Sequence, residues 1–407
     1  MNEIHSTSLN NPSDEITSDE EQIEDLPYKN KTERRLNTQP YDYAVRSLVD
    51  MVIDGELILN PEYQRQYVWD DGKASRFIES LLLNIPVPVI YLNEESDGRY
   101  TVIDGQQRLT SLLRFTRPDE LESLSKTANL SPLEPLILTK LKVRADLDGL
   151  GFRQLEYSDK TGLNKRHLRC IVILNESDPN LKFEVFERLN TGSVALSDQE
   201  IRNCVYRGAF NNLLSKCASL SQYQELIRFP MEKKKQLKDQ EFVLRFFAYR
   251  DLPPDYNDNY AEYLSNYMEQ YRIISSEQES NLLKLFEKTV NLIHKILTPN
   301  TAFRKPKDAN DPEQGWSTSF INGAIYESQM IVYSCLPDLS QLSHEQINSL
   351  RKATHGVFAE EIYSRSIYQG TARKERVLRR TRSLYDAVRQ VINDIERLPM
   401  LQSHLES

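Results

Sequence analysis

The sequence lacks the residue patterns that identify several large classes of hydrolase. Its four cysteines form no Cys-x-x-Cys pair, and its six histidines show no His-x-x-x-His spacing. Both spacings are typical of metal sites, so no metal site is predicted. A Gly-x-x-x-x-Gly-Lys-Ser/Thr loop and a Gly-x-Ser-x-Gly elbow are missing as well. A hydrolase built on serine, cysteine or zinc is therefore not expected.

Long apolar runs are also missing. No stretch approaches the roughly 20 apolar residues that a membrane-spanning helix needs, and residues 1–27 lack the basic and apolar regions of a signal peptide. The four cysteines lie far apart, which favours reduced, buried thiols over a disulfide framework. They are Cys170, Cys204, Cys217 and Cys335. We therefore expect a cytoplasmic protein that makes no membrane contact.

Basic residues are missing from positions 1–27, which hold eight acidic side chains and no Lys or Arg. Taking these eight from the 60 acidic residues of the chain leaves 52, against 51 Lys and Arg. The net charge of −9 therefore belongs to the N-terminal segment, and the rest of the chain is nearly neutral. Because the segment also contains no aromatic residue, we expect it to be disordered.

The spacing of apolar residues predicts two kinds of structure along the chain. Short strands alternate with helices up to about residue 217, with one irregular stretch at 117–165, and only helices follow beyond about residue 220. Helices are predicted at 45–53, 71–83, 180–189, 197–206, 208–217, 239–250, 259–273, 277–297, 317–335, 343–364 and 371–396, and strands at 57–59, 86–92, 100–103 and 168–174. The predicted fold class is α+β.

The most informative segment runs from the strand at 100–103 through an Asp-Gly turn into a helix. The first turn of that helix carries Gln106, Gln107 and Arg108, beside backbone N–H groups that readily bind a phosphate or another anion. A cation there opposes the helix dipole by about 0.3–1 kcal/mol, and a nearby anion would remove the conflict. Asp104 and Gln107 also have the spacing of a capping box. The segment alone leaves both interpretations open.

Two further segments combine polar and aromatic residues outside regular structure. Residues 60–69 form a loop of the kind that serves as a binding surface on a rigid scaffold, although its Tyr and Trp side chains could equally cover the edge of a core. The Asn-Thr-Gly turn at 190–192 is chemically an ordinary helix end. After it, Ser197 and Glu200 have the spacing of a second capping box.

The last predicted helix is strongly basic. Its positive side chains could follow the phosphate backbone of a nucleic acid, or they could form a solvated face that pairs with acidic side chains. The candidate nucleic-acid contacts are Arg373, Lys374, Arg376, Arg379 and Arg380.

Five motifs of the chain occur together in the order of a known family. They are Asn-Pro-Glu-Tyr-Gln-Arg-Gln-Tyr-Val-Trp at 60–69, Ile-Pro-Val-Pro at 85–88, Asp-Gly-Gln-Gln-Arg at 104–108, Phe-Glu-Arg-Leu-Asn-Thr-Gly at 186–192 and Gln-Glu-Ile-Arg-Asn at 199–203. In order and approximate spacing they resemble the N-terminal domain of GmrSD-type restriction endonucleases, which belongs to the ParB/sulfiredoxin-like superfamily. The resemblance covers about residues 40–215.

This resemblance implies an α+β architecture in which a small mixed-sheet ParB/sulfiredoxin-like domain is followed by an all-α helical domain. The expected division is a disordered acidic tail at 1–38, a nucleotide-binding domain at 39–218 and a helical domain at 219–407. The implied function is to bind an NTP with Mg²⁺ as a component of a restriction-like anti-phage defence system that acts on DNA; the resemblance leaves open whether the NTP is hydrolysed.

The family motifs also imply which residues form the site. Asp104 and Arg108 would occupy the catalytic positions, with Asp104 orienting a water or a magnesium ion and Arg108 clamping the phosphate charge. The nucleotide would be held by Gln64, Arg65, Gly105, Gln106, Gln107, Arg108, Asn190, Thr191, Arg202 and Asn203.

One departure from the family leaves the reaction open. Members with two functions carry a His-Asn-His-type nuclease domain at the C-terminal end, and no such motif is recognisable in this sequence. A separate nuclease subunit could therefore supply DNA cleavage. The alternatives are an NTP-dependent DNA endonuclease in its own right and a non-catalytic DNA-binding regulatory module. Sulfiredoxin chemistry is not expected, because the corresponding turn there uses Cys where this chain has Gln.

Overall fold

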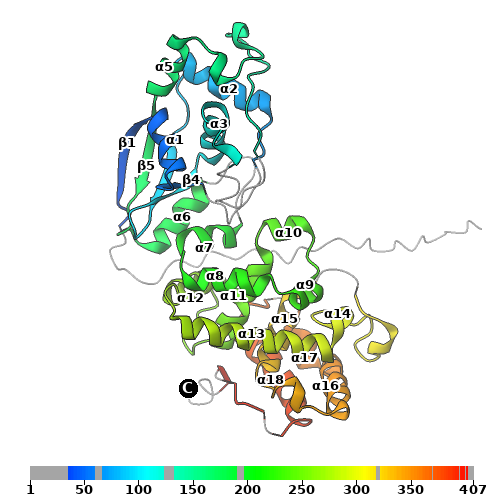
Figure 1. The fold of residues 1–407 in the computed structure, drawn as a ribbon. Coiled ribbons are helices and arrows are strands. Elements are labelled where there is room, and N and C mark those ends of the chain that lie inside the picture. The colour runs from blue at the N-terminus through cyan, green and yellow to red at the C-terminus, as the bar shows by residue number, and fades with distance from the viewer. Residues whose placement is uncertain are drawn as a thin grey trace, which may run out of the picture. The chain divides into compact units, whose positions relative to one another are not determined.

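The computed structural model of the chain describes most of the residues after the N-terminal segment. The described ranges are 35–59, 67–122, 133–189, 197–317, 321–368, 370–393, 395–398 and 400–401. Within them, a mixed sheet with helices comes first and a largely helical region follows (Figure 1). The predicted α+β class is confirmed.

Five strands form one sheet in the order β1-β5-β3-β4-β2. The strands are β1 (Thr38–Ala44), β2 (Leu57–Ile58), β3 (Ile90–Glu94), β4 (Tyr100–Asp104) and β5 (His167–Ile173). β5 pairs antiparallel with β1 and parallel with β3, while β4 pairs antiparallel with β3 and parallel with β2. The sheet is therefore mixed, as the family resemblance implies.

Four helices share a first hydrophobic core with this sheet. They are α1 (Val45–Ile53), α2 (Asp71–Leu82), α3 (Gln106–Thr116) and α5 (Tyr157–Lys165). Leu48 and Val52 of α1 are buried one turn apart, as an amphipathic helix requires. Leu112 of α3 and Val172 of β5 complete the interior with them. This core holds β4 and α3 in place and so positions the turn between the two elements.

Most of the remaining helices contribute side chains to a second core. The remaining helices are α6 (Pro179–Leu189), α7 (Asp198–Val205), α8 (Ala209–Ala218), α9 (Ser221–Ile227), α10 (Met231–Lys235), α11 (Lys238–Arg250), α12 (Tyr260–Gln270), α13 (Ser276–Ile296), α14 (Thr298–Thr301), α15 (Gly323–Tyr333), α16 (His344–Gly356), α17 (Glu361–Ser366) and α18 (Lys374–Arg389). Of these, α10 and α14 contribute no residue to the second core. Short 3-10 helices lie at 145–147 and 152–154, where they pack against the first core, and at 312–314, 339–341 and 357–359. Phe186 of α6 and Ile201 of α7 already belong to this second core. The predicted boundary at 218/219 stays a prediction.

Several predicted element bounds were wrong for identifiable reasons. The irregular stretch at 117–165 contains α5, which buries only Leu163 and therefore shows no apolar periodicity. The helix predicted at 343–364 is two helices, because α16 ends at Gly356 and α17 starts at Glu361. β3 begins at Ile90, after the prolines that the predicted strand included. Strand β1 and the short helices α9, α10 and α14 were not predicted.

Two compositional expectations concern the whole chain. All four cysteines are free and buried, which confirms that they form no disulfide framework. Among the helices of the described ranges, none is long and apolar enough to cross a bilayer.

Candidate functional site

The turn between β4 and α3 depends on a glycine. Gly105 precedes the helix with φ 110° and ψ 3°, in the left-handed region that L side chains rarely adopt. A Cβ atom at this position would lie 3.0 Å from Cγ1 and 3.1 Å from Cγ2 of Ile90. Glycine is therefore needed both for the backbone conformation and for the close approach of β3.

Arg108 is held inside the chain by three acceptors. Its Nη2 atom lies 2.6 Å from Oδ2 of Asp104, and its Nη1 donates to the backbone carbonyls of Pro88 and Val89, the latter at 3.0 Å. Only 9% of the Arg108 side chain is exposed, whereas 47% of Asp104 is. The Arg108 cation opposes the helix dipole at this helix start, and the carboxylate of Asp104 is the anion that offsets its charge.

The capping-box interpretation of this turn was wrong. Gly105, not Asp104, is the N-cap residue, and no side chain caps the helix. The Gln107 Oε1 atom instead accepts hydrogen bonds from the backbone N–H groups of Val68 (2.9 Å) and Trp69 (3.3 Å). The first backbone N–H groups of α3 therefore have no partner within the helix, and no described side chain accepts from them. Beside them, the Gln106 side chain is half-buried.

The second predicted capping box is confirmed. The Ser197 N–H donates to Oε2 of Glu200 at 2.6 Å, and the Ser197 hydroxyl accepts from the Glu200 N–H at 3.2 Å. This box starts α7, the helix that carries Arg202 and Asn203. Four other predicted nucleotide contacts lie outside the described residues: Gln64, Arg65, Asn190 and Thr191.

Arg202 and Asn203 belong to a buried polar network between α7 and α11. The Arg202 Nε atom donates to Oε1 of Gln199 at 2.9 Å, and the Gln199 amide donates to Oδ1 of Asn203 at 2.8 Å. The Asn203 amide in turn donates to Oε1 of Gln240 on α11 at 2.7 Å. Both predicted residues are almost completely buried, and no hydrogen bond or ion pair of the described residues joins them to the α3 turn.

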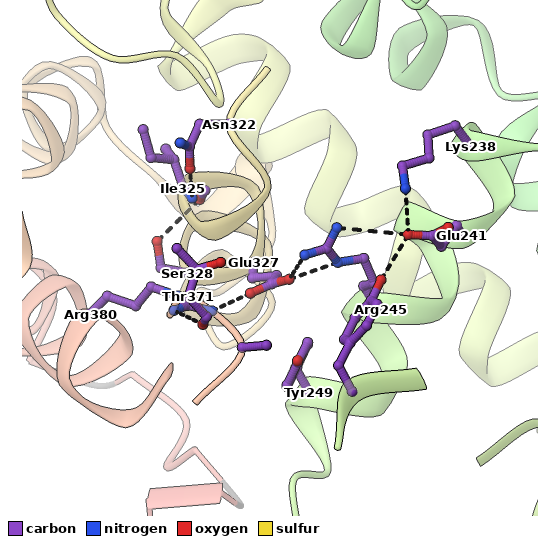
Figure 2. Close-up of polar contacts among 12 residues, drawn as sticks. Lys238, Glu241, Arg245, Tyr249, Asn322, Ile325, Glu327, Ser328, Thr371 and Arg380 are labelled. Atoms are coloured by element: carbon purple, nitrogen blue, oxygen red, sulfur yellow. Dashed lines mark hydrogen bonds and ion pairs between the residues drawn. The ribbon is translucent and has the colours of Figure 1, made fainter. Parts of the chain in front are cut away.

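The network continues through the helical region as alternating charges (Figure 2). Glu241 on α11 accepts from Lys238 at 2.8 Å, and Arg245 one turn later contacts Glu327 of α15 at 2.6 Å. Glu327 also pairs with Arg380 of α18. Burial alone raises the pKa of Glu241, but the nearby cations, Lys238 foremost, lower the pKa to about 2. The carboxylate is therefore charged throughout the physiological range.

Arg380 was wrongly predicted to contact nucleic acid. Its side chain is completely buried, and besides Glu327 it binds the carbonyl of Thr371 at 2.6 Å. A polyanion at the surface cannot reach it, because it is an interior ion-pair partner. Local sequence patterns could not predict this, because its partner Glu327 is far away along the chain.

The other basic residues of α18 lie at or near the surface. Arg376 and Arg379 line a hollow with Arg365 and Ile362 of α17. Arg379 pairs with Glu375, Arg365 pairs with Glu361, and Arg376 donates to the Arg365 carbonyl. Arg373 is exposed, and the Lys374 N–H donates to Oδ1 of Asp258 at 2.6 Å. Sequence reasoning missed Arg365, whose only local signal was its spacing from Glu361.

Metal binding at the β4–α3 turn would need ligands from outside the described side chains. No three His, Cys, Asp or Glu side chains of the described ranges converge as a protein-only metal site would need. Asp104 would offer its Oδ1 atom to a magnesium ion that arrived with a nucleotide, because Arg108 pairs with its other oxygen, Oδ2. Such ions commonly keep several waters and take one or two carboxylates plus phosphate oxygens.

The comparisons with known proteins identify one part of the chain. Residues 45–207 match the family described as GmrSD restriction endonuclease, N-terminal domain, so this segment is a domain of that family. The match contains the β4–α3 turn and ends just after α7. Neither a curated protein nor a solved structure matches the chain.

Proposed function

Starting from the GmrSD N-terminal domain at residues 45–207, we propose that this chain is the NTP-binding component of a restriction system. The β4–α3 turn would receive the phosphates of the nucleotide. The observation that carries the proposal is the start of α3, where a left-handed glycine is followed by uncapped backbone N–H groups. A helix start of this kind binds phosphate through its N–H groups and its dipole.

The surrounding side chains suggest a division of roles at this turn. Gln106 is half-buried beside the N–H groups that no described side chain caps, and it would donate its amide to a phosphate oxygen. Arg108 would act mainly as a positioning residue, because its guanidinium already binds Asp104 and the backbone carbonyls of the two residues that precede β3. The free oxygen of Asp104 would contact magnesium or orient a water. Hydrolysis of the bound NTP would be measured as the release of inorganic phosphate.

The test is a thermal-shift series of the full chain with the four NTPs and Mg²⁺. An NTP at about 100 times its dissociation constant adds roughly 2.7 kcal/mol to the free energy of unfolding, so the melting temperature should rise for the preferred nucleotide. Gln106→Glu should abolish this rise by repelling the phosphates. The same change should not weaken the fold, because an acidic residue in the first helical turn contributes about 0.3–1 kcal/mol of stability.

Gln222→Glu is the matched control. Gln222 is exposed in the first turn of α9, which also lacks an acidic residue and a side-chain cap. The control makes the same chemical change at a comparable helix start and should keep the full nucleotide response. Two results would contradict the proposal: no melting-temperature rise with any NTP, or an undiminished rise in Gln106→Glu.

A second activity, DNA binding, is supported by the hollow between α17 and α18. Arg365, Arg376 and Arg379 line it, and 76% of Arg365 and 57% of Arg379 are exposed. Arginines on an exposed surface can neutralise phosphates and release counterions. The chain would in this way hold DNA while a separate nuclease subunit cleaves it.

The DNA test measures affinity for a duplex by fluorescence anisotropy over a range of salt concentrations. Removing both exposed arginines (Arg365→Ala with Arg379→Ala) should weaken binding and reduce the slope of log K against log salt by about 1 for each lost phosphate contact. Arg188→Ala is the control, since Arg188 is 75% exposed and pairs with Glu184 at the same i,i+4 spacing. Equal effects of the control and the double variant would assign DNA binding to another surface.

Two other expectations stay predictions. One is the cytoplasmic location, which the free buried cysteines favour. The other is an endonuclease activity of the chain by itself, which metal-dependent cleavage of DNA by the purified protein would establish.

A further inference from the structure

The Arg202 guanidinium is buried without partners for most of its donors. Its side chain is 0% exposed, and among the described residues its Nε atom alone has a hydrogen-bond acceptor, Oε1 of Gln199 at 2.9 Å. The Nη1 and Nη2 atoms have none, since Oε2 of Glu241 is 3.7 Å from Nη2. A guanidinium cannot lose its charge in a protein. Unpaired buried donors of a charged group are costly, which indicates that an acceptor belongs at this place.

The chain of ion pairs that begins at Arg202 contains more cations than carboxylates. Glu241 is shared among Arg202, Lys238 and Arg245, and Glu327 is shared between Arg245 and Arg380. In these ion pairs four cations share two carboxylates, as Figure 2 shows for all but Arg202. A buried excess of positive charge is unfavourable unless an anion offsets it.

This chain of ion pairs reaches the surface at Lys238. The Lys238 side chain is 37% exposed, and Gln240 and Tyr260 beside it are half-buried. The Tyr260 hydroxyl donates to Oε1 of Glu241 at 2.7 Å, so this carboxylate keeps a donor if the ammonium of Lys238 turns toward another anion. Lys238 could therefore contact an anion at the surface that also binds the more deeply buried guanidinium of Arg202.

We propose that Arg202 and Lys238 form a second anion site, which takes a phosphate-class oxyanion. The free Nη1 and Nη2 atoms of Arg202 present the fork that matches two oxygens of such an ion, and Lys238 adds a point charge. Free pyrophosphate and the phosphate tail of a nucleotide share this chemistry. The site is distinct from the α3 turn and goes beyond the function proposed above.

The experiment titrates the full chain with inorganic pyrophosphate by calorimetry, without magnesium and at constant ionic strength. It is done in the Gln106→Glu background, which removes the α3 turn as an anion site. Binding should persist there and weaken at least tenfold when Lys238→Met or Arg202→Met is added. Lys216→Met is the control, because Lys216 pairs with Glu279 in the same way at 2.5 Å and lies elsewhere. Lys238→Met keeps the test valid if Arg202→Met fails to fold.

The two sources of phosphate are distinguished by repeating the titration with an NTP in the same variants. A tenfold loss for both ligands in Lys238→Met supports a site that accepts free and nucleotide-borne phosphate, and a loss for pyrophosphate alone supports a site for the free ion. Pyrophosphate affinity that is equal in Lys238→Met and Lys216→Met would overturn the proposal. So would the absence of binding in Gln106→Glu. An unchanged NTP response of Gln106→Glu relative to wild type would instead contradict the α3 site and leave this one standing.

Discussion

At the scale of single residues, the β4–α3 turn shows how one side chain can satisfy a neighbour and leave the backbone free. Asp104 neutralises Arg108, Gln107 holds the N–H groups of Val68 and Trp69, and neither caps the helix. The side chains of Asp104, Gln107 and Arg108 therefore stabilise the conformation of the turn and its neighbours. What remains available for a ligand is the backbone, with the amide of Gln106 beside it.

The first residue-scale prediction concerns Gly105. Gly105→Ala adds a Cβ in a left-handed conformation and 3.0 Å from Ile90, so both backbone strain and overpacking should oppose it. The backbone part costs about 1–2 kcal/mol, and overpacking typically costs a further 1–3 kcal/mol or so. Urea unfolding measures the loss. Gly55→Ala separates the two parts, because Gly55 also has a positive φ (75°) but nothing within 4 Å of an added Cβ. Equal losses at the two positions would show that contact with Ile90 is unimportant.

At the scale of elements, a single side chain of α2 organises the long connection that sequence patterns left irregular. The Glu79 carboxylate accepts the backbone N–H groups of Lys142 (3.1 Å), Val143 (2.7 Å) and Arg144 (2.8 Å). Three neighbouring N–H groups are thereby satisfied without regular structure. Apolar periodicity could not predict this, because the stabilising contact is polar and joins segments far apart in the sequence.

The element-scale prediction is that Glu79→Gln destabilises the chain by about 1.5–3 kcal/mol at neutral pH, the range for hydrogen bonds to a charged group. Burial alone raises the pKa of Glu79, but the three N–H groups leave it below its usual value. Its contribution is therefore present above about pH 4.3, the unfolded pKa, and is lost as the pH falls through the lower folded pKa. Melting temperatures of both proteins from pH 7 downward should converge in acid.

The control for this pH series is Glu120→Gln. Glu120 is an exposed side chain, so this change should leave stability within about 0.5 kcal/mol of wild type. A gap between wild type and Glu79→Gln that stays constant below pH 4 would mean that the carboxylate charge is not what the loop requires.

At the scale of the whole molecule, the matched family domain and the helical region share residues of one core. α6 and α7 lie within residues 45–207, yet Phe186, Ile201 and Tyr206 pack among side chains of the later helices. The charge network starts on α7 and runs through α11 and α15 to α18. The last part of the family domain is therefore built jointly with the helices that follow it.

We accordingly predict that a fragment ending at residue 207 does not fold on its own. Cutting there exposes Ile201, Val205 and Tyr206, which are at most 6% exposed in the full chain. The fragment should bind the dye ANS and lose its near-UV circular dichroism, as expanded states with exposed apolar surface do. The full chain should show neither change. A cooperative thermal transition of the fragment without dye binding would show that residues up to 207 form an independent domain.

The sequence by itself determined the α+β class, the helix spans with clear apolar periodicity such as Val45–Ile53, the capping box at Ser197 and the family of residues 45–207. These features follow from residues a few positions apart, because helix spacing and caps are local. Only the tertiary structure decided that Arg108 is engaged by Asp104 and two carbonyls, that Arg380 is interior, and that Arg202 has free donors. A charged side chain takes its role from the partners that folding brings to it, and local sequence does not encode which distant partners those are.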